Sequence, residues 1–229
     1  MNSIRRSLNL SACALALAAS FASLPARADD ASDAKTLVDK ATITVNSFAK
    51  DADQASLPAL LSKAKAVLVY PQILEGGFVI GGSGGTGVLL VRDAATGNFS
   101  EPAFYTMGGL SLGLLAGGQA AEVILLVNSQ KALDAMLSTS VKLGGGLSVA
   151  VGPKGAGQAA NVTADLVSYS RAKGAYAGMS LDGQVIDVRD RLNAAYYGKA
   201  ASPVDIFVRK NVSSPASAPL QAALKAMAK

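Results

Sequence analysis

Residues 66–93, AVLVYPQILEGGFVIGGSGGTGVLLVRD, decide the fold class of this chain. They contain three short apolar runs, at 66–70, 78–80 and 88–91, whose valine, isoleucine and aromatic residues favour β-strands. We expect the first run to end at Pro71, because proline fixes its own φ and cannot donate to a sheet ladder. Short strands separated by turn residues predict a mainly antiparallel sheet.

A glycine-rich tract separates the second run from the third. Five of the seven residues at 81–87 are glycine. Backbone without a Cβ can bend sharply, form a bulge or lie against a large group. We therefore predict that the tract is a crossing between strands that closely approaches another backbone, a helix or a ligand. The candidate close-approach glycines are Gly81, Gly82, Gly84 and Gly85.

Helical periodicity precedes and follows this stretch. Apolar residues at three- and four-residue steps predict an N-terminal helix over about 30–51. Its acids balance its bases and alanine is plentiful, which favours packing on the sheet over docking on a bilayer. Shorter helices are expected at 56–65, 129–137, 190–197 and 202–209, and further strands at 102–115, 122–127, 141–143, 147–151, 165–169, 175–181 and 184–188.

These elements predict an α+β fold. We expect one twisted, mainly antiparallel sheet or partial barrel of short glycine-interrupted strands, with the N-terminal helix and the shorter helices packed on it. A single domain should occupy residues 29–212. Residues 213–229 read as a polar linker followed by a weak C-terminal helix.

Residues 1–28 have the pattern of a cleaved export signal. Two arginines precede an apolar stretch rich in Ala and Ser, and residues 26–28 form an A-x-A cleavage site. The protein is therefore expected to be exported, either periplasmic or secreted, and peripherally associated with a membrane. Two rival interpretations are lipidation of Cys13, which too few apolar residues precede, and twin-arginine export, for which the flanking residues match poorly.

The basic character of the chain belongs largely to this signal. The chain has 21 Lys and Arg against 16 Asp and Glu, and the signal holds three Arg and no acid, which leaves 18 against 16, or +2. Basic residues interleaved with aromatic residues, the pattern of a nucleic-acid surface, are missing. We expect no nucleic-acid partner.

The scarcity of reactive side chains argues against an enzyme. Cys13 is the only cysteine and there is no histidine, so the commonest general base and transition-metal ligand are missing. Gly82, Gly84 and Gly87 match a dinucleotide fingerprint, but strand residues follow where a helix is required. We expect no catalytic residues, metal or cofactor.

Four cations are candidates for an anion site. Arg171 and Lys173 alternate along an expected strand and can therefore project from one side. Together with Lys142 and Lys154, they could cradle a lipid phosphate. Ordinary solvated charges at a strand end explain these residues equally well.

Several linked motifs occur in order within about residues 57–207: PQILEGGFVIGGSGGTGVLLVRD, FSEPAFYTMGGLSLGLLAGGQAAEVILLV, KLGGGLSVAVGPKGAG, SYSRAKGAYAGMSLDG and NAAYYGK. Together they resemble the SYLF-domain family, also described as a yeast actin-regulator family. The resemblance implies a lipid-binding module, since eukaryotic members recognise phosphoinositides and some bind or bundle actin filaments. With its export signal, the chain resembles the bacterial stand-alone branch.

Two functional hypotheses follow. The first is a non-enzymatic module that binds anionic, phosphoinositide-like headgroups of a membrane surface through Lys142, Lys154, Arg171 and Lys173. The second is a structural or protein-interaction module of the cell envelope without lipid specificity, with an envelope or host protein as its partner. Lipid-dependent binding that weakens with salt would distinguish the first from the second.

Overall fold

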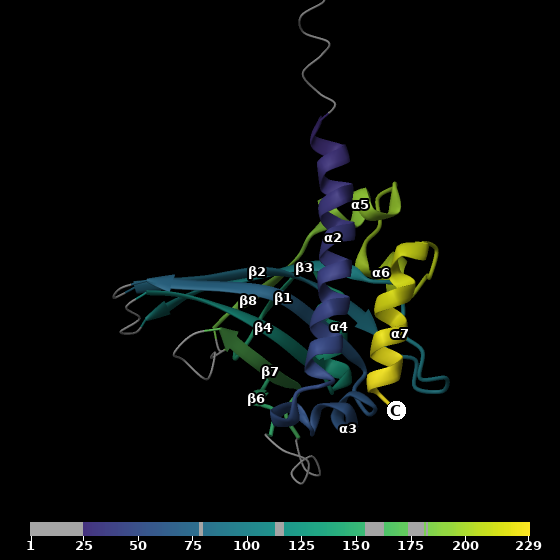
Figure 1. Ribbon diagram of the computed structural model, residues 1–229. Helices are drawn as coiled ribbons and strands as arrows, with labels where there is room; N and C mark the ends of the chain where they lie inside the picture. The colour runs from purple at the N-terminus through teal and green to yellow at the C-terminus, as the bar shows by residue number, and fades with distance from the viewer. Residues whose placement is uncertain (1–24, 78–79, 113–116, 154–162, 174–180, 182) are drawn as a thin grey trace, which may run out of the picture.

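The computed structural model of the chain describes residues 25–77, 80–112, 117–153, 163–173, 181 and 183–229. Within these residues, eight strands form one curled sheet in the order β5-β8-β3-β2-β1-β4-β7-β6 (Figure 1). The strands are β1 (Ala66–Gly77), β2 (Ile80–Val91), β3 (Ala103–Leu112), β4 (Gly117–Val127), β5 (Ser140–Lys142), β6 (Val149–Val151), β7 (Leu166–Lys173) and β8 (Val185–Val188).

The strand pairing confirms the predicted sheet. The neighbouring strands pair antiparallel, except for β6 and β7, which run parallel. The sheet is a half-barrel, and helices pack on both of its faces. These helices are α2 (Pro25–Phe48), α3 (Leu57–Leu61), α4 (Gln130–Met136), α5 (Asp190–Tyr197), α6 (Pro203–Phe207) and α7 (Ala218–Met227), with short 3-10 turns at Ala52–Gln54 and Pro215–Ser217. The predicted α+β class is therefore confirmed.

Strand β1 does not end at Pro71, as the sequence predicted. It continues to Gly77, and its register with β2 shifts between Val69 and Ile73. Proline is tolerated at such an irregularity, because the ladder there does not require its missing N–H. The strand therefore passes through the proline by means of a bulge.

The glycine tract is not a crossing between strands. It belongs to β2, which is in register with β3 from Ile80 to Leu89 without interruption. Glycine disfavours a strand only mildly, and long neighbours on both sides of β2 supply the ladder that outweighs this preference. The expected strand at 175–181 and its turn at 182–183 lie almost entirely outside the described residues.

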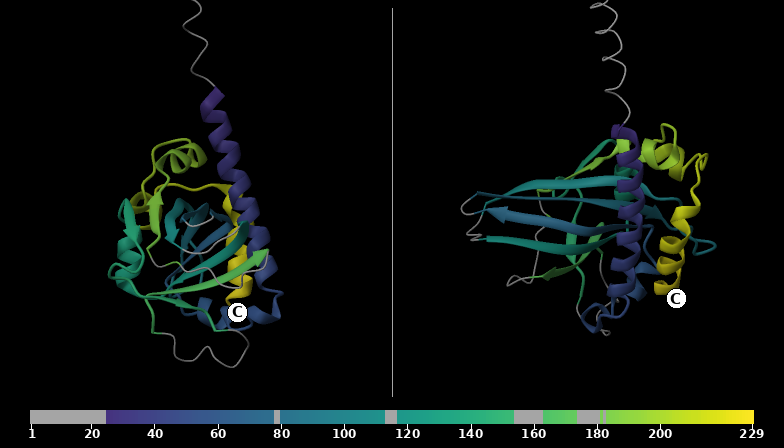
Figure 2. Two further views of the ribbon diagram at one scale, coloured as in Figure 1. Left: turned by 90° about the vertical axis from the view of Figure 1, so that its left-hand side faces the viewer. Right: turned by 45° about the horizontal axis from the view of Figure 1, so that its top comes forward.

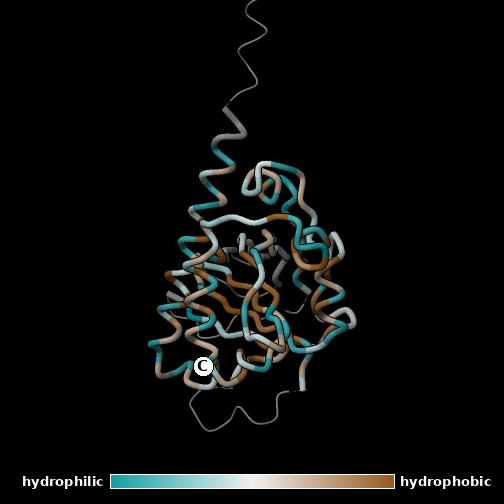
Figure 3. The backbone as a smooth tube through the Cα atoms, turned by 90° about the vertical axis from the view of Figure 1, so that its right-hand side faces the viewer, coloured by the Kyte–Doolittle hydropathy of each residue, from teal (hydrophilic) through white to brown (hydrophobic). Residues whose placement is uncertain are grey.

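Two hydrophobic cores lie on the two faces of the sheet. Alternate residues of β1 enter each core: Val67 and Val69 pack with α2, α3 and α7, whereas Leu68 and Tyr70 pack with α4 and α6. Figure 2 shows α2 and α7 on one side of the sheet and α4 on the other. Because this half of the sheet is covered on both faces, its strands are apolar at almost every position, as the brown segments in Figure 3 show.

The strand halves that carry the glycines extend beyond the helices. In Figure 1, β1 to β4 project to the left, away from α2. On this projection Leu74 is 57% exposed, whereas Leu68 on the same strand is fully buried. The sheet thus has a two-sided, helix-covered half and a projecting half rich in small residues.

The first and last helices support one face of the sheet. Helix α2 spans Pro25–Phe48 rather than the predicted 30–51, and it buries the expected apolar stripe, including Val38, Val45 and Phe48. Helix α7, expected to be weak, buries Leu220 and Leu224 in the same core. The prediction that α2 is a core-packed helix is confirmed.

Capping side chains determine where two of the shorter helices begin. The Ser129 hydroxyl accepts the Ala132 N–H at the start of α4. At α6, Ser202 and Asp205 form a complete capping box. Serine and aspartate satisfy the free N–H groups of a first helical turn, which is why these helix starts could be located in the sequence.

The parallel edge strand β6 is held by a carboxylate, and this contact predicts a pH dependence. Asp165 accepts both the backbone N–H and the hydroxyl of Ser148, each at 2.9 Å. Hydrogen bonds from Ser129 and Ser148 lower the pKa of Asp165 to about 2. Because the folded-state pKa is lowered, the stabilisation is present above the ordinary value of about 4 and is lost as the pH falls toward 2.

We therefore expect Asp165→Asn to lower stability at neutral pH and to flatten the acid decline between about pH 4 and pH 2. Urea melts over this pH range measure both effects. The matched control is Asp33→Asn, which changes an exposed aspartate of α2. If stability falls just as steeply with acid in Asp165→Asn, ionised Asp165 does not stabilise the fold in the way proposed.

Candidate functional site: the hollow beside helix α2

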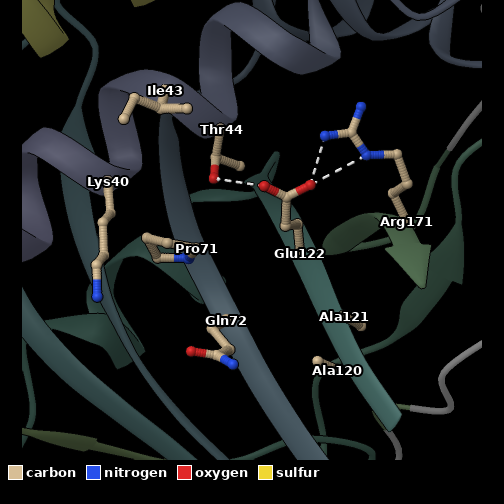
Figure 4. A pocket seen from close by; sticks show the side chains of 9 residues that line it. All are labelled: Lys40, Ile43, Thr44, Pro71, Gln72, Ala120, Ala121, Glu122 and Arg171. Atoms are coloured by element: carbon tan, nitrogen blue, oxygen red, sulfur yellow. Dashed lines mark hydrogen bonds and ion pairs between the residues drawn. The ribbon is translucent and has the colours of Figure 1, made fainter. Parts of the chain in front are cut away.

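A hollow of about 280 Å³ lies where α2 crosses the start of the projecting sheet. Figure 4 shows side chains of α2, β1, β4 and β7 around it. The lining residues are Lys40, Ile43, Thr44, Pro71, Gln72, Ala120, Ala121, Glu122 and Arg171. The bulge of β1 at Pro71 therefore forms part of its wall.

One wall of the hollow is an ion-pair cluster that ties α2 to the sheet. The Nε of Arg171 donates to Glu122 Oε2 at 3.0 Å, and the guanidinium also donates to Ser47 at 2.6 Å. A second carboxylate, Asp51, lies 3.7 Å from Arg171. Glu122 in turn accepts the Thr44 hydroxyl at 3.1 Å (Figure 4). The charge of Arg171 is thus compensated by two acids.

Packing also fixes this guanidinium, since it lies 5.1 Å from the centre of the Phe48 ring, within cation–π range. The side chains of Arg171 and Glu122 are 31% and 20% exposed, so both are partly removed from water. Such a cluster positions the last turns of α2 over β4 and β7. Its chief role in the structure is to hold this wall in place.

The opposite rim of the hollow combines an apolar side chain with a cation. Ile43, on α2, is 67% exposed, and Lys40 is one helical turn before it and also exposed. Lys40 takes part in none of the ion pairs found among the described residues. An anionic group at this rim would therefore meet a cation that no carboxylate already neutralises.

Beyond the hollow, small residues occupy the centre of this face of the sheet. Leu74 is in register with Gly84 on one side and with Ala120 on the other, and Gly84 is in register with Gly108. Residues in such a row share a face of the sheet. The next row on this face contains Gly76, Gly82 and Gly118 and continues to Leu110 of β3. The nearest partners of Leu74 across the two ladders therefore have little or no side chain.

The glycines of β2 fall into two steric classes. A Cβ at Gly85 would collide with the Gln72 carbonyl and lie 2.9 Å from Ile73 Cγ1, and one at Gly87 would lie 2.6 Å from the Tyr70 ring. At Gly82 and Gly84, the nearest atoms would be 3.8 and 3.7 Å away, which is ordinary contact. Gly85 and Gly87 are thus required by the bulge of β1.

The four predicted cations do not form one described cluster. Arg171 lines the hollow, and the backbone of Lys173 is in register with Ala120, which also lines it. Lys142 is exposed on β5, at the other end of the sheet order. Lys154 lies outside the described residues. Lys40, the exposed cation at the rim, was not singled out from the sequence.

The described residues contain no group of three or more His, Cys, Asp or Glu arranged to hold a metal ion. In the same part of the chain, no helix is long and apolar enough to cross a membrane. What the hollow presents is a fixed polar wall, an apolar rim and an uncompensated cation. Such an arrangement suits the binding of a group that is partly anionic and partly apolar.

Comparison with known proteins shows the family of the chain. The model of the family Ysc84, described as "Las17-binding protein actin regulator", matches residues 108–227. Protein YSC84 of Saccharomyces cerevisiae is 30% identical over 206 residues, which are 85% of this chain and 44% of the relative. LAS seventeen-binding protein 3 of the same yeast is 31% identical with the same coverage. SH3 domain-containing YSC84-like protein 1 of Bos taurus is 30% identical over 71% of this chain and 48% of its own length.

The chain thus spans less than half the length of these relatives. No solved structure matches it. The curled sheet, with α2 across one face and a glycine-rich projection, defines a half-barrel α+β domain. The chain belongs to the Ysc84 family of Las17-binding protein actin regulators, the SYLF-domain family that its motifs resemble.

Proposed function

We propose that this domain is a non-enzymatic module that binds the anionic headgroups of a phospholipid surface at the hollow beside α2. The observation that carries the proposal is the exposed apolar side chain of Ile43 beside Lys40 on the rim of the hollow. Ile43 is 67% exposed, and Leu74 on β1, which is 57% exposed, is in register with Ala120 of the lining. Isolated exposed apolar residues are common, but one on the rim of a hollow beside a lysine, with a second on the adjoining sheet, favours an interfacial site.

Electrostatics supports the same surface. Each Lys or Arg close to an anionic membrane contributes about 1 kcal/mol to binding. Lys40 is the cation that we propose to face the headgroups, and Lys142, Lys154 and Lys173 remain further candidates. Arg171 has a different role in this proposal: it holds the wall of the hollow through Glu122. The SYLF resemblance, which implies lipid recognition, is consistent with the proposed binding of headgroups.

The predicted export signal indicates from which side the domain would meet a membrane. If residues 1–28 are removed, the domain meets a membrane from the periplasmic or external side. Asp30 would then lie near the start of α2, where a carboxylate is favourable because the first N–H groups of a helix carry partial positive charge. Its ion pair with Arg191 at 2.7 Å would be retained.

Vesicle sedimentation tests the proposal. The protein should sediment with phosphatidylcholine vesicles only when phosphatidylglycerol is added, and less so at 1 M salt, where the Debye length falls to about 3 Å. Lys40→Glu should weaken binding at least about fivefold, because it replaces an attractive charge by a repulsive one. Ile43→Ser should weaken it also, by removing the apolar contact.

The matched control is Lys199→Glu, which makes the same charge reversal in the exposed segment after α5, away from the hollow. It should change sedimentation much less than Lys40→Glu. Equal losses in the two variants would mean that only net charge matters, and the hollow would be rejected as the site. Equal sedimentation with neutral and anionic vesicles would reject the headgroup specificity.

A protein partner is the second candidate, favoured by one specific observation. The face that carries Gly82, Gly84 and Gly118 needs no glycine for steric reasons, so close approach of another backbone would explain it. One relative, a yeast protein, is named as binding LAS seventeen, which supports a protein ligand as the second candidate. Binding to an envelope protein without lipid dependence, lost on introducing bulk at Gly84, would favour this candidate.

A further inference from the structure

A second, larger hollow lies apart from the one beside α2. Its volume is about 560 Å³, within the range of roughly 300–1,000 Å³ typical of small-molecule sites. It is formed by the β2–β3 connection, the segment after α6, and α7. In Figure 1 this connection lies beside α7, to the right of the sheet. None of the residues assigned to the membrane surface lines it.

The walls of this second hollow are held by hydrogen bonds. In the β2–β3 turn, Asp93 Oδ1 accepts the N–H of Thr96 at 2.8 Å and that of Ala95 at 3.1 Å. From α7, Gln221 donates to the Ser100 carbonyl at 3.1 Å. Because both sides of the connection are tied in this way, the hollow is formed before any ligand arrives. Binding would therefore require little ordering of the chain.

Part of its lining is apolar. Phe99 of the connection and Phe207 of α6 are each 7% exposed, and Val212 is 9% exposed. These side chains belong to the lining, so a ligand in the hollow would complete their burial. Burial of apolar surface contributes about 25 cal/mol per Å², which makes an apolar ligand body favourable here.

Two cations, Arg92 and Lys210, line the same hollow. Neither takes part in an ion pair found in the described part of the chain, although Lys210 is near enough to Asp93 to lower the pKa of that carboxyl. The Nε of Arg92 is buried and has no hydrogen-bond partner there. Buried polar groups are nearly always hydrogen-bonded, so such a guanidinium calls for an explanation. An acceptor bound at the guanidinium would compensate for it.

The two acids of the lining are already engaged by the protein. Asp93 accepts donors of its own turn, and these hydrogen bonds lower its pKa. Glu101 accepts the Ser214 N–H at 3.2 Å, and burial raises its pKa. One oxygen of each acid, Asp93 Oδ1 and Glu101 Oε2, is thus occupied by donors of the protein, whereas the Nε of Arg92 has no such partner among the described residues.

We propose that this hollow binds a small amphiphilic anion. Arg92 and Lys210 hold its carboxylate or phosphate head, and Phe99, Phe207 and Val212 pack against its apolar body. Arginine suits the head because its planar fork matches two oxygens of a carboxylate or phosphate. The site is independent of the membrane proposal, because it uses different residues on different elements.

Isothermal titration of the purified full chain tests this site, with octyl phosphate and octanoate as probes below their micellar concentrations. We expect one molecule of each to bind per chain, with octanol and inorganic phosphate at least about tenfold weaker, because each lacks one half of the ligand chemistry. Octanol as strong as octyl phosphate would overturn the role of the cations. Inorganic phosphate as strong as octyl phosphate would overturn the role of the apolar part of the lining.

Two variants locate the bound anion. Arg92→Gln should weaken octyl phosphate about tenfold. Lys210 has φ +52°, a conformation that glycine adopts easily, so Lys210→Gly should fold at least as well and still weaken binding. Arg209→Gln, which changes the neighbouring arginine paired with Asp205, should leave binding unchanged. Undiminished binding in both Arg92→Gln and Lys210→Gly would overturn the proposal.

Discussion

Gly85→Ala is expected to destabilise the fold by about 3 kcal/mol, near the upper end of overpacking penalties. The added Cβ would collide with the Gln72 carbonyl and lie 2.9 Å from Ile73 Cγ1. The Gln72 carbonyl belongs to the backbone of the β1 bulge, and Ile73 is also in register with Ala121 of β4, so β1 cannot move away without disturbing a second ladder. For a domain of this size, 3 kcal/mol corresponds to a fall in Tm of roughly 6–12 °C.

Gly84→Ala is the matched control, one residue earlier on the same strand. Its Cβ would have no neighbour closer than 3.7 Å, so we expect no loss, and a gain of up to about 0.5 kcal/mol from removing glycine from a strand. Thermal and urea unfolding of both variants measure the difference. Equal stability of the two variants would show that a Cβ at Gly85 does not collide with the bulge of β1.

Arg171→Met is expected to lower the free energy of unfolding by about 2–3 kcal/mol. Methionine retains packing against Phe48 but leaves the Glu122 carboxylate, which is only 20% exposed, without its main partner. Glu122→Met should cost less, about 1–2 kcal/mol, because Arg171 retains Asp51 and Ser47. The double variant should cost less than the sum of the two, with a coupling of about 1–2 kcal/mol.

Arg209→Met provides the comparison for this cluster. Arg209 pairs with Asp205 at 2.8 Å, but its side chain is 65% exposed, so its loss should cost less than about 0.5 kcal/mol. Chemical denaturation of the four variants completes the double-mutant cycle and its control. A purely additive Arg171–Glu122 pair would contradict the coupling that we expect between these two side chains.

The parts of the fold that local chemistry determines could be predicted from the sequence. The starts of α4 and α6 follow from Ser129 and Ser202, whose hydroxyls accept N–H groups three residues on. The buried stripe of α2 follows from its periodicity. The antiparallel sheet follows from short β-branched runs separated by turn residues.

Two predictions about β1 and β2 are wrong because local sequence does not show which strands pair with these residues. Pro71 was expected to end a strand, but a bulge removes the need for its N–H. The glycine tract was expected to be a crossing, but β3 pairs with it along its whole length and β1 pairs with it up to Gly85, where the bulge begins. In both cases the tertiary ladder outweighs local propensity, and neither ladder can be read from a single stretch of sequence.

The candidate site was only partly accessible from sequence for the same reason. Arg171 was singled out as a cation on a strand, but its partner Glu122 is 49 positions away and is brought opposite it by the β4–β7 register. One signal was available: Glu122 is a lone acid at the head of the apolar run 122–127. The hollow itself depends on where α2 crosses the sheet, which no local pattern specifies.

The length of the outermost strands has a consequence for the protein in concentrated solution. In the described sheet, β5 and β6 form the two margins, and each has only three residues. A margin this short offers few unpaired N–H and C=O groups to another chain, which is one way in which natural sheets avoid joining edge to edge into aggregates. These two margins therefore give a neighbouring molecule little to extend, whereas in the projecting half β3 beyond Gly108 and β4 before Ala120 are paired on one side only among the described strands.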